Sequence, residues 1–155
     1  MTRILLYIAL ILPWFSLFFI RKSTIKRFMP VTIFTALLMT IVFQIAYTYD
    51  WWVIHEYIAP WGHMIDVSFA YGVFAVGTLW IFILTHHSYV KYLITNMVFD
   101  GFFSFFVFDI LDKLGIGTIK NLKEWQYFLI MLLVSVIIYI YFRWQDTIWK
   151  EDDHE

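Results

Sequence analysis

Five long apolar runs, each close to the length that crosses a lipid bilayer, constrain this chain more than any other feature. A helix needs about 20 predominantly apolar residues to cross the hydrocarbon layer, and unpaired backbone groups there cost several kcal/mol each. No run shows the alternation of polar and apolar residues that is typical of a membrane-spanning strand. The sequence therefore predicts an all-α polytopic membrane protein, a bundle of about five helices, with spans at residues 4–20, 31–49, 67–84, 89–111 and 125–142.

Composition supports this class. Hydrophobic residues make up 62% of the 155 residues and charged residues only 15%, so a soluble domain could not cover the apolar surface. The net charge of -1 provides no basic field for nucleic acid, which we exclude as a partner. Cysteine is absent, which excludes disulfides and thiolate catalysis. We expect a single membrane domain over residues 1–155 that contacts the lipid bilayer and either itself or another membrane protein.

The connecting segments carry helix boundary signals. "RKSTIKRFMP" separates the first two runs, and Pro30 suits the first position of a helix. "LGIGTIKNLKE" separates the last two, and Gly115 and Gly117 can end a helix. The first run is too long for a signal peptide and is followed by positive charge instead of a cleavage pattern, so we expect it to remain uncleaved.

Basic residues predict the orientation, because cytoplasmic loops carry an excess of Lys and Arg. The first connection holds four basic residues, whereas residues 50–66 hold none and three acids. With five crossings, seven of the eleven basic residues lie on the side of the first connection. We therefore expect the N-terminus outside and a short acidic tail, residues 143–155, in the cytoplasm.

Aromatic residues flank the runs. Rings with a polar edge settle at the headgroup level, which predicts interfacial belts. A sugar- or quinone-binding aromatic platform is the less favoured alternative. The residues concerned are Tyr47, Tyr49, Trp51, Trp52, Tyr57, Trp61, Trp125, Tyr127, Trp144 and Trp149.

Several short stretches bear a resemblance to a known family. They are "RFMPVTIF", "YDWW", "GTLWIF", "YLITNMVFD" and "DKLGI", within residues 26–116. Together they resemble a family of small multi-pass membrane proteins of Bacillus- and Clostridium-type bacteria for which no function is established. The resemblance implies a multi-pass protein of the bacterial cytoplasmic membrane, and it implies no catalytic residue.

Polar residues inside the fourth run are the main functional candidates. Asn96, Asp100 and Ser104 are four apart and share one helix face. Asp100 lies at mid-span, where an aspartate costs about 2.5 to 3.5 kcal/mol on insertion scales. We therefore expect it to be neutral and to face other helices, whereas Asp109 near the headgroups stays ionised. The hydrogen-bond partners expected at similar depth are Asn96, Thr40, Gln44 and Thr78.

Two interpretations of Asp100 remain open. It either forms a structural hydrogen bond between helices or acts as a protonatable group in a proton- or cation-coupled pathway. The structural interpretation is favoured, because relays usually chain several ionisable groups and Asp100 is alone among the spans.

Small residues predict close packing of the third run. Ser68, Gly72, Ala75 and Gly77 would let another helix backbone approach, either within the chain or in a dimer. The stretch "FLIMLLVSVIIYIYF" of the fifth run contains only Ser135 as a polar interruption. We expect this helix to be the most lipid-exposed, and the third and fourth to be the most central.

Histidines and acids outside the runs match no metal motif. His55, Glu56, His63 and Asp66 share one connection, with Asp109 and Asp112 at a neighbouring helix end. Imidazole and carboxylate can ligate zinc, but loop acids are usually solvated, so we expect neither a metal nor a cofactor. His86 and His87 have no facing histidine for haem.

The sequence contains no catalytic or phosphate-binding motif, so we expect no enzyme. The favoured function is a structural, interaction or assembly protein, and the alternative is a small proton- or cation-coupled transporter or pore subunit that uses Asp100.

Overall fold

The computed structural model describes residues 1–152 and is 77% helical, with five helices, four of them long and apolar enough to cross a membrane. The four are α1 (Thr2–Phe15) with the 3-10 turn η1 (Ser16–Phe19); α2 (Lys22–Thr48); the continuous α4 (Tyr89–Phe102), η3 (Phe103–Val107) and α5 (Phe108–Lys113); and α6 (Glu124–Asp152). The fifth is shorter and consists of η2 (Phe69–Phe74) and α3 (Ala75–Thr85). Both η2 and η3 are π-helical.

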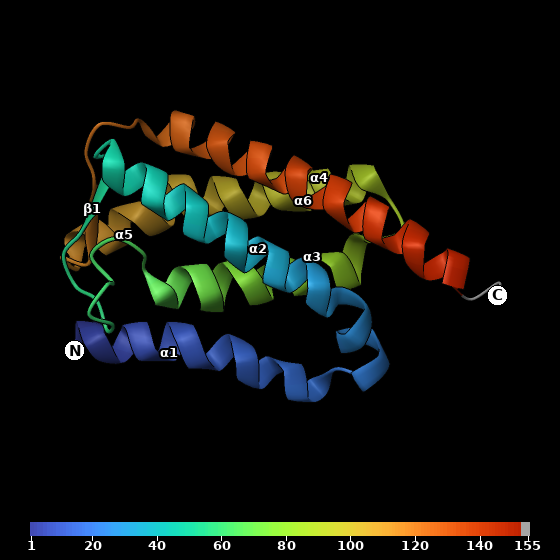
Figure 1. Cartoon of the computed structure of the whole chain (residues 1–155). Coiled ribbons are helices and arrows are strands. Elements are labelled where there is room, and N and C mark those ends of the chain that lie inside the picture. The colour runs from blue at the N-terminus through green and yellow to red at the C-terminus, as the bar shows by residue number, and fades with distance from the viewer. Residues whose placement is uncertain (153–155) are drawn as a thin grey trace.

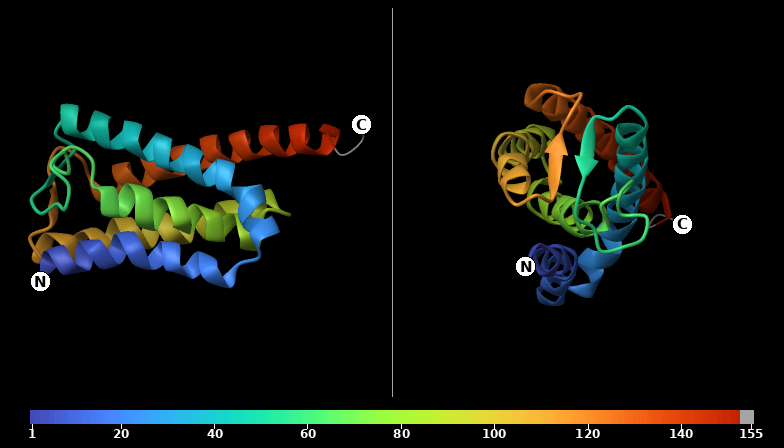
Figure 2. Two further views of the ribbon diagram at one scale, coloured as in Figure 1. Left: turned by 60° about the horizontal axis from the view of Figure 1, so that its bottom comes forward. Right: turned by 90° about the vertical axis from the view of Figure 1, so that its left-hand side faces the viewer.

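Successive helices run in alternating directions, and the two termini lie at opposite ends of the bundle (Figure 1). α3 contacts α2 and α4, whereas α1 rests mainly on η2. The end-on view in Figure 2 shows α1 at the edge of the bundle. This arrangement is compatible with five crossings.

A two-stranded ribbon joins two connections at the end of the bundle that carries the N-terminus, so the chain is not purely helical. β1 (Trp52–Ile54) pairs antiparallel with β2 (Gly117–Ile119), and Trp52 lies opposite Ile119. The segments are too short for a recognisable period of two, and they pair because the packed helices bring the two connections together. We call this end, with the loop of residues 55–66, the ribbon end.

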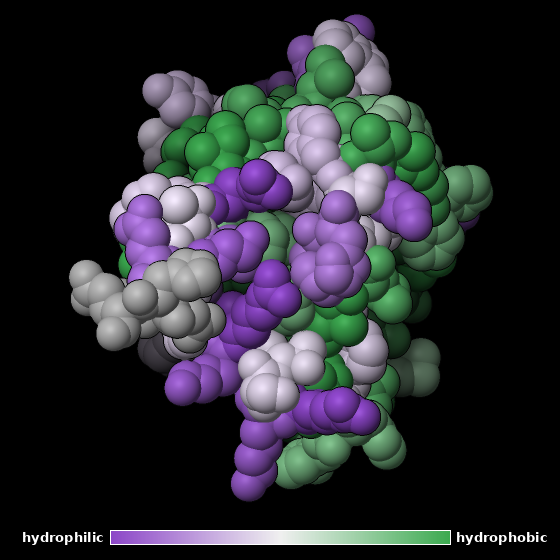
Figure 3. All heavy atoms as spheres, turned by 90° about the vertical axis from the view of Figure 1, so that its right-hand side faces the viewer, coloured by the Kyte–Doolittle hydropathy of each residue, from purple (hydrophilic) through white to green (hydrophobic). Residues whose placement is uncertain are grey.

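Basic residues gather at the opposite end, which we call the basic end: Arg21, Lys22, Lys26, Arg27, Lys91, Arg143 and Lys150. Figure 3 looks onto this end and shows hydrophilic side chains gathered on the face, with hydrophobic side chains around them. Charged side chains therefore gather at this end with apolar side chains around them, which is compatible with a membrane location.

The start of α2 differs from the prediction. α2 begins at Lys22, so Pro30 lies inside the helix and not at its first position. The missing N–H of a proline removes one helical hydrogen bond. Contacts with α6 hold the preceding turns: Arg27 pairs with Asp146 at 2.9 Å, and Nε2 of Gln145 donates to the Arg27 carbonyl at 3.2 Å.

The far end of α6 also extends past its predicted span. α6 continues to Asp152, so most of the segment that was expected to be a tail is helical. Lys150 pairs with Asp146 one turn earlier at 2.9 Å, which supports this extension.

The prediction that the fifth run is the most lipid-exposed and the fourth among the most central was wrong, because α6 buries 33% of its apolar window and the fourth run only 22%. α1 buries only Leu6, which is 6% of its apolar window, against 33% for α6. Overall hydropathy does not distinguish a helix that faces lipid from one that faces other apolar helices. The side chains that α6 buries are Tyr127, Met131, Val134, Ser135, Ile138, Phe142 and Gln145.

Two of the predicted belt aromatics belong to the core. Trp52 is 7% exposed and Tyr127 is 2% exposed, and their rings meet edge to face at 5.7 Å. The others lie near the bundle ends, and all but the half-buried Trp51 are exposed. The polar edge of an aromatic ring therefore does not by itself identify an interfacial residue.

Candidate functional site

The polar face of α4 points into the bundle. Asn96, Asp100 and Ser104 are 6%, 3% and 1% exposed. They are four residues apart, so a single helix face presents all three to α6 and α3. This is the placement that an intramembrane carboxyl group requires.

Ser135 of α6 is the hydrogen-bonding partner of this face, and it was not among the predicted partners. Its hydroxyl lies 3.3 Å from Oδ2 of Asp100 and 3.1 Å from Oδ1 of Asn96. Thr40 bonds instead with the Tyr71 hydroxyl at 2.9 Å. Gln44 is exposed. The single serine in the fifth run could have indicated a polar contact of this helix. Partners were predicted from their depth along the spans, however, and depth does not reveal which helices face each other.

The geometry around Ser135 favours a neutral Asp100. The Ser135 hydroxyl also lies 3.0 Å from the Met131 carbonyl, so three oxygens surround it. Nδ2 of Asn96 donates to the Tyr92 carbonyl at 2.9 Å, which fixes the amide with its oxygen toward Ser135. A hydroxyl has one proton to donate. A protonated Asp100 can donate to Ser135 in return, whereas a carboxylate would compete for that one proton.

A small cavity adjoins Asp100, and we call it the central cavity. Its volume is about 20 Å³, which suffices for roughly one water molecule. The predicted partner Thr78 lies on its wall without a hydrogen bond to Asp100. The lining residues are Thr35, Met39, Phe74, Thr78, Ile81, Asn96, Phe99, Asp100, Met131, Val134, Ser135 and Ile138.

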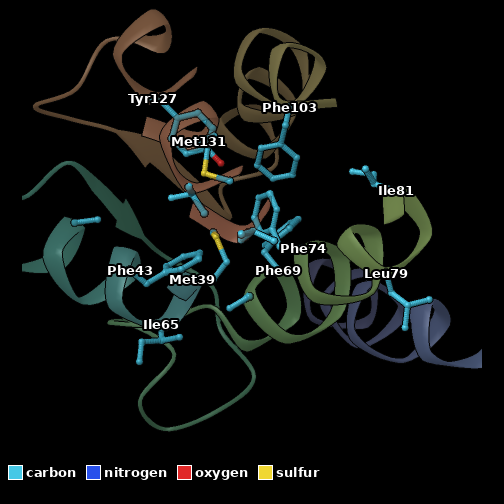
Figure 4. Close-up of a cluster of buried hydrophobic side chains, with 14 of the residues drawn as sticks. Met39, Phe43, Ile65, Phe69, Phe74, Leu79, Ile81, Phe103, Tyr127 and Met131 are labelled. Carbon is cyan, nitrogen blue, oxygen red and sulfur yellow. The ribbon is translucent and has the colours of Figure 1, made fainter. Parts of the chain in front are cut away.

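A second cavity, the ribbon cavity, lies beneath the β-ribbon and has a volume of about 40 Å³. Met39 and Phe74 line both cavities, so these two side chains separate them. Figure 4 shows Met39, Phe69, Phe74 and Phe103 converging on this region. The lining residues are Met39, Phe43, Trp52, Val53, Ile54, Asp66, Phe69, Phe74, Phe103, Phe108, Leu111, Ile116, Gly117, Thr118 and Tyr127.

Asp66 lines the ribbon cavity, so the expectation that it is a solvated loop acid was wrong. It is 5% exposed. Its Oδ1 accepts from the backbone N–H groups of Ser68 at 2.9 Å and Phe69 at 3.4 Å, which caps the helix that follows. Burial raises the pKa of Asp66 to about 6, against the opposing effect of these two backbone hydrogen bonds and of the Ser68 side chain. The position of Asp66 just before a helix could be read from the sequence. Its burial could not, because the ribbon that covers it forms only in the tertiary structure.

The two π-helical segments contribute to the ribbon cavity. Phe69 and Phe74 come from η2, and Phe103 comes from η3. The π-helical segment η2 is also hydrogen-bonded to α1: Nε1 of Trp14 donates to the Tyr71 carbonyl at 2.9 Å. Short π-helical turns are frequent at functional sites.

The small residues of the third run face the interior of the bundle, and Gly72 packs against α1. A Cβ at Gly72 would overlap the Ala9 carbonyl oxygen and lie 2.8 Å from Cα of Leu10. Gly77 is looser, because a Cβ there would lie 3.6 Å from the Phe99 ring. Ser68 and Ala75 are 0% and 1% exposed. The close approach at Gly72 is therefore used inside the chain.

The remaining loop acids and histidines have separate partners. Glu56 pairs with Arg3 at 3.2 Å, and Nδ1 of His63 lies 3.3 Å from the Pro60 carbonyl. Exposed Asp109 pairs with Lys113 at 3.9 Å. Over residues 1–152, no three His, Asp or Glu side chains are placed to hold a metal ion.

Thr118 of the ribbon connects His55 to Asp112. Nε2 of His55 lies 3.1 Å from Oγ1 of Thr118, and that hydroxyl donates to Asp112 at 2.7 Å. At the basic end, the rings of His86 and His87 lie 3.6 Å apart between centroids and are tilted by 44°. Of these residues only Thr118 lines a cavity, the ribbon cavity; the three histidines and Asp112 line neither cavity.

Comparison of the chain with protein-family models, with curated proteins and with solved structures finds no match.

Proposed function

We propose that this chain is a small proton- or cation-coupled transporter, or a pore subunit, of the bacterial cytoplasmic membrane, and that Asp100 carries the coupled charge. The supporting observation is the pair of adjoining cavities, each with one buried acid. A structural role was favoured because Asp100 was expected to be the only buried acid. Asp66 is a second buried acid, so that reason no longer holds.

The space beside Asp100 also supports a transport role. Protein interiors are packed closely, and a hydrogen bond that only joins two helices needs no adjoining cavity. Met39 and Phe74 line both cavities, and of these two the methionine side chain rotates readily and adapts to its neighbours. In this proposal a proton exchanges at Asp66, crosses the ribbon cavity and reaches Asp100 when Met39 moves. The chain carries out no covalent chemistry.

Replacing Asp100 by Asn should abolish coupled proton movement. Asparagine keeps the size and a hydrogen bond to Ser135 but has no exchangeable charge state. In proteoliposomes with an internal pH dye and an imposed potential, we expect the native protein to move protons faster than lipid alone. Asp100→Asn should reduce that rate at least tenfold.

Asp109→Asn is the matched control, because Asp109 is an exposed acid on the same continuous helix. It should leave the proton flux unchanged. Equal flux in native protein and Asp100→Asn, or no flux above protein-free liposomes, would reject the transport proposal.

We also propose that the N-terminus lies outside and the C-terminus in the cytoplasm. The seven cations of the basic end against four at the ribbon end support this orientation. A reporter fused after Glu155 should behave as cytoplasmic, and one inserted within residues 57–62 as external. Two reporters on the same side would contradict an odd number of crossings.

The second candidate function is a structural, interaction or assembly protein. The exposed apolar face of α1 favours it, because one helix that buries a single residue leaves most of its surface for lipid, a second copy or another membrane protein. The residues on this face include Ile4, Tyr7, Ile8, Ile11, Leu12 and Phe15. Stable protein without proton flux would support this candidate.

A further inference from the structure

We propose that the ribbon cavity binds a small organic ammonium cation, with Asp66 as its counter-ion and the surrounding aromatic rings as its walls. This inference rests on the proposed function, since it names the class of cargo that would occupy one of the same two cavities.

The walls of the ribbon cavity are aromatic to an unusual degree. Seven of its fifteen lining residues are Phe, Tyr or Trp. The rings form a connected set: Trp52 meets Phe43 at 5.4 Å and Tyr127 at 5.7 Å, and Tyr127 meets Phe108 at 4.7 Å. Aromatic rings attract cations through their quadrupole, and sets of rings are used to recognise methylated ammonium groups.

Asp66 supplies an unpaired negative charge to these walls. Its Oδ1 caps the helix and the Ser68 hydroxyl lies close to the carboxylate, but no Lys, Arg or His among residues 1–152 forms an ion pair with Asp66. No Lys, Arg or His lines the cavity. An ionised Asp66 therefore lacks a counter-ion, and burial of an unpaired charge is costly. A bound cation would remove that cost.

The size of the cavity selects the kind of cation. A volume of about 40 Å³ corresponds to roughly three water molecules. A sugar or a quinone ring does not fit this space, whereas an ammonium group with one or two methyl groups does. Its methyl groups would contact the rings, which a strongly hydrated inorganic ion would not do.

Proton competition at Asp66 provides a signature of this site. The pKa of Asp66 is raised to about 6, so the proton displaces the cation as the pH falls below 6. Affinity should be roughly tenfold lower at pH 5 than at pH 8. Tyr127 is the other titratable group on the wall, and His55 and Asp112 contact Thr118 at the ribbon.

Titration of the purified full chain in detergent with methylammonium and dimethylammonium chloride tests the inference. Calorimetry and tryptophan fluorescence should both report binding, since Trp52 is on the wall. Two control probes separate charge from methyl groups. Sodium chloride supplies a cation without methyl groups, and tert-butanol supplies methyl groups without a charge. Asp66→Asn should weaken binding at least tenfold while it keeps the helix cap, and Asp109→Asn should have no effect.

A second pair of variants tests the aromatic contribution. Phe108→Leu removes a ring from the cavity wall and should weaken binding roughly threefold to tenfold. Phe106→Leu removes an exposed ring on η3, outside the cavity, and should change nothing. A native fold of each variant is checked by its thermal unfolding transition.

Three results would overturn the inference: no saturable ammonium binding, binding unaffected by Asp66→Asn, or equal binding of sodium. Ammonium binding without proton flux in liposomes would retain this site and reject transport. Proton flux without ammonium binding would retain transport and reject this site.

Discussion

Gly72→Leu should displace α1 from the bundle and lower the free energy of unfolding by about 3 kcal/mol or more. The first atom of any side chain at this position would overlap the Ala9 carbonyl and lie 2.8 Å from Cα of Leu10. Those atoms are backbone, so they cannot move aside without shifting the helix. The Trp14 hydrogen bond to the Tyr71 carbonyl would be lost with the displacement.

Alanine substitutions provide the matched comparison. Gly72→Ala should already lower the unfolding temperature in detergent, whereas Gly77→Ala should raise it or leave it unchanged, because a Cβ there makes an ordinary contact with Phe99 at 3.6 Å. Limited proteolysis between η1 and α2 should show α1 released in the Gly72 variants. Equal melting of the two alanine variants would contradict close packing at Gly72.

Ser135→Ala should lower the free energy of unfolding by about 2 kcal/mol, because one hydroxyl serves both Asn96 and Asp100. Without it, their buried oxygens lose a partner, and each unsatisfied buried group costs about 1 to 3 kcal/mol. Chemical or thermal unfolding in detergent measures the change. The contact between Tyr92 and the Ser135 carbonyl is a backbone interaction and should survive.

Ser104→Ala is the control for this substitution. Ser104 is 1% exposed, and its hydroxyl has no hydrogen-bond partner among residues 1–152. Removal of an unpaired buried hydroxyl should be neutral or stabilising. If both alanine variants lose the same stability, the effect reflects lost volume and not the hydrogen bonds of Ser135.

The helices were predictable because each one satisfies its own backbone and must be apolar over a known length. The burial of Asp100 was predictable for a related reason, since a carboxyl group at mid-span has only the bundle interior to face. Pro30 shows the limit of local signals. Contacts between α2 and α6, which the sequence does not display, extend α2 past the residue that was expected to begin it.

The sequence by itself determined that the chain forms a bundle of apolar helices and that the face of Asn96, Asp100 and Ser104 turns inward, because hydropathy and helical period are local properties. Only the tertiary structure decided that Ser135 is the partner of Asp100, that α1 is the exposed helix, and that the ribbon buries Asp66 among aromatic rings. Each of these depends on which segments meet in space. That choice follows from the packing of side chains across helices, and no single stretch of the chain records it.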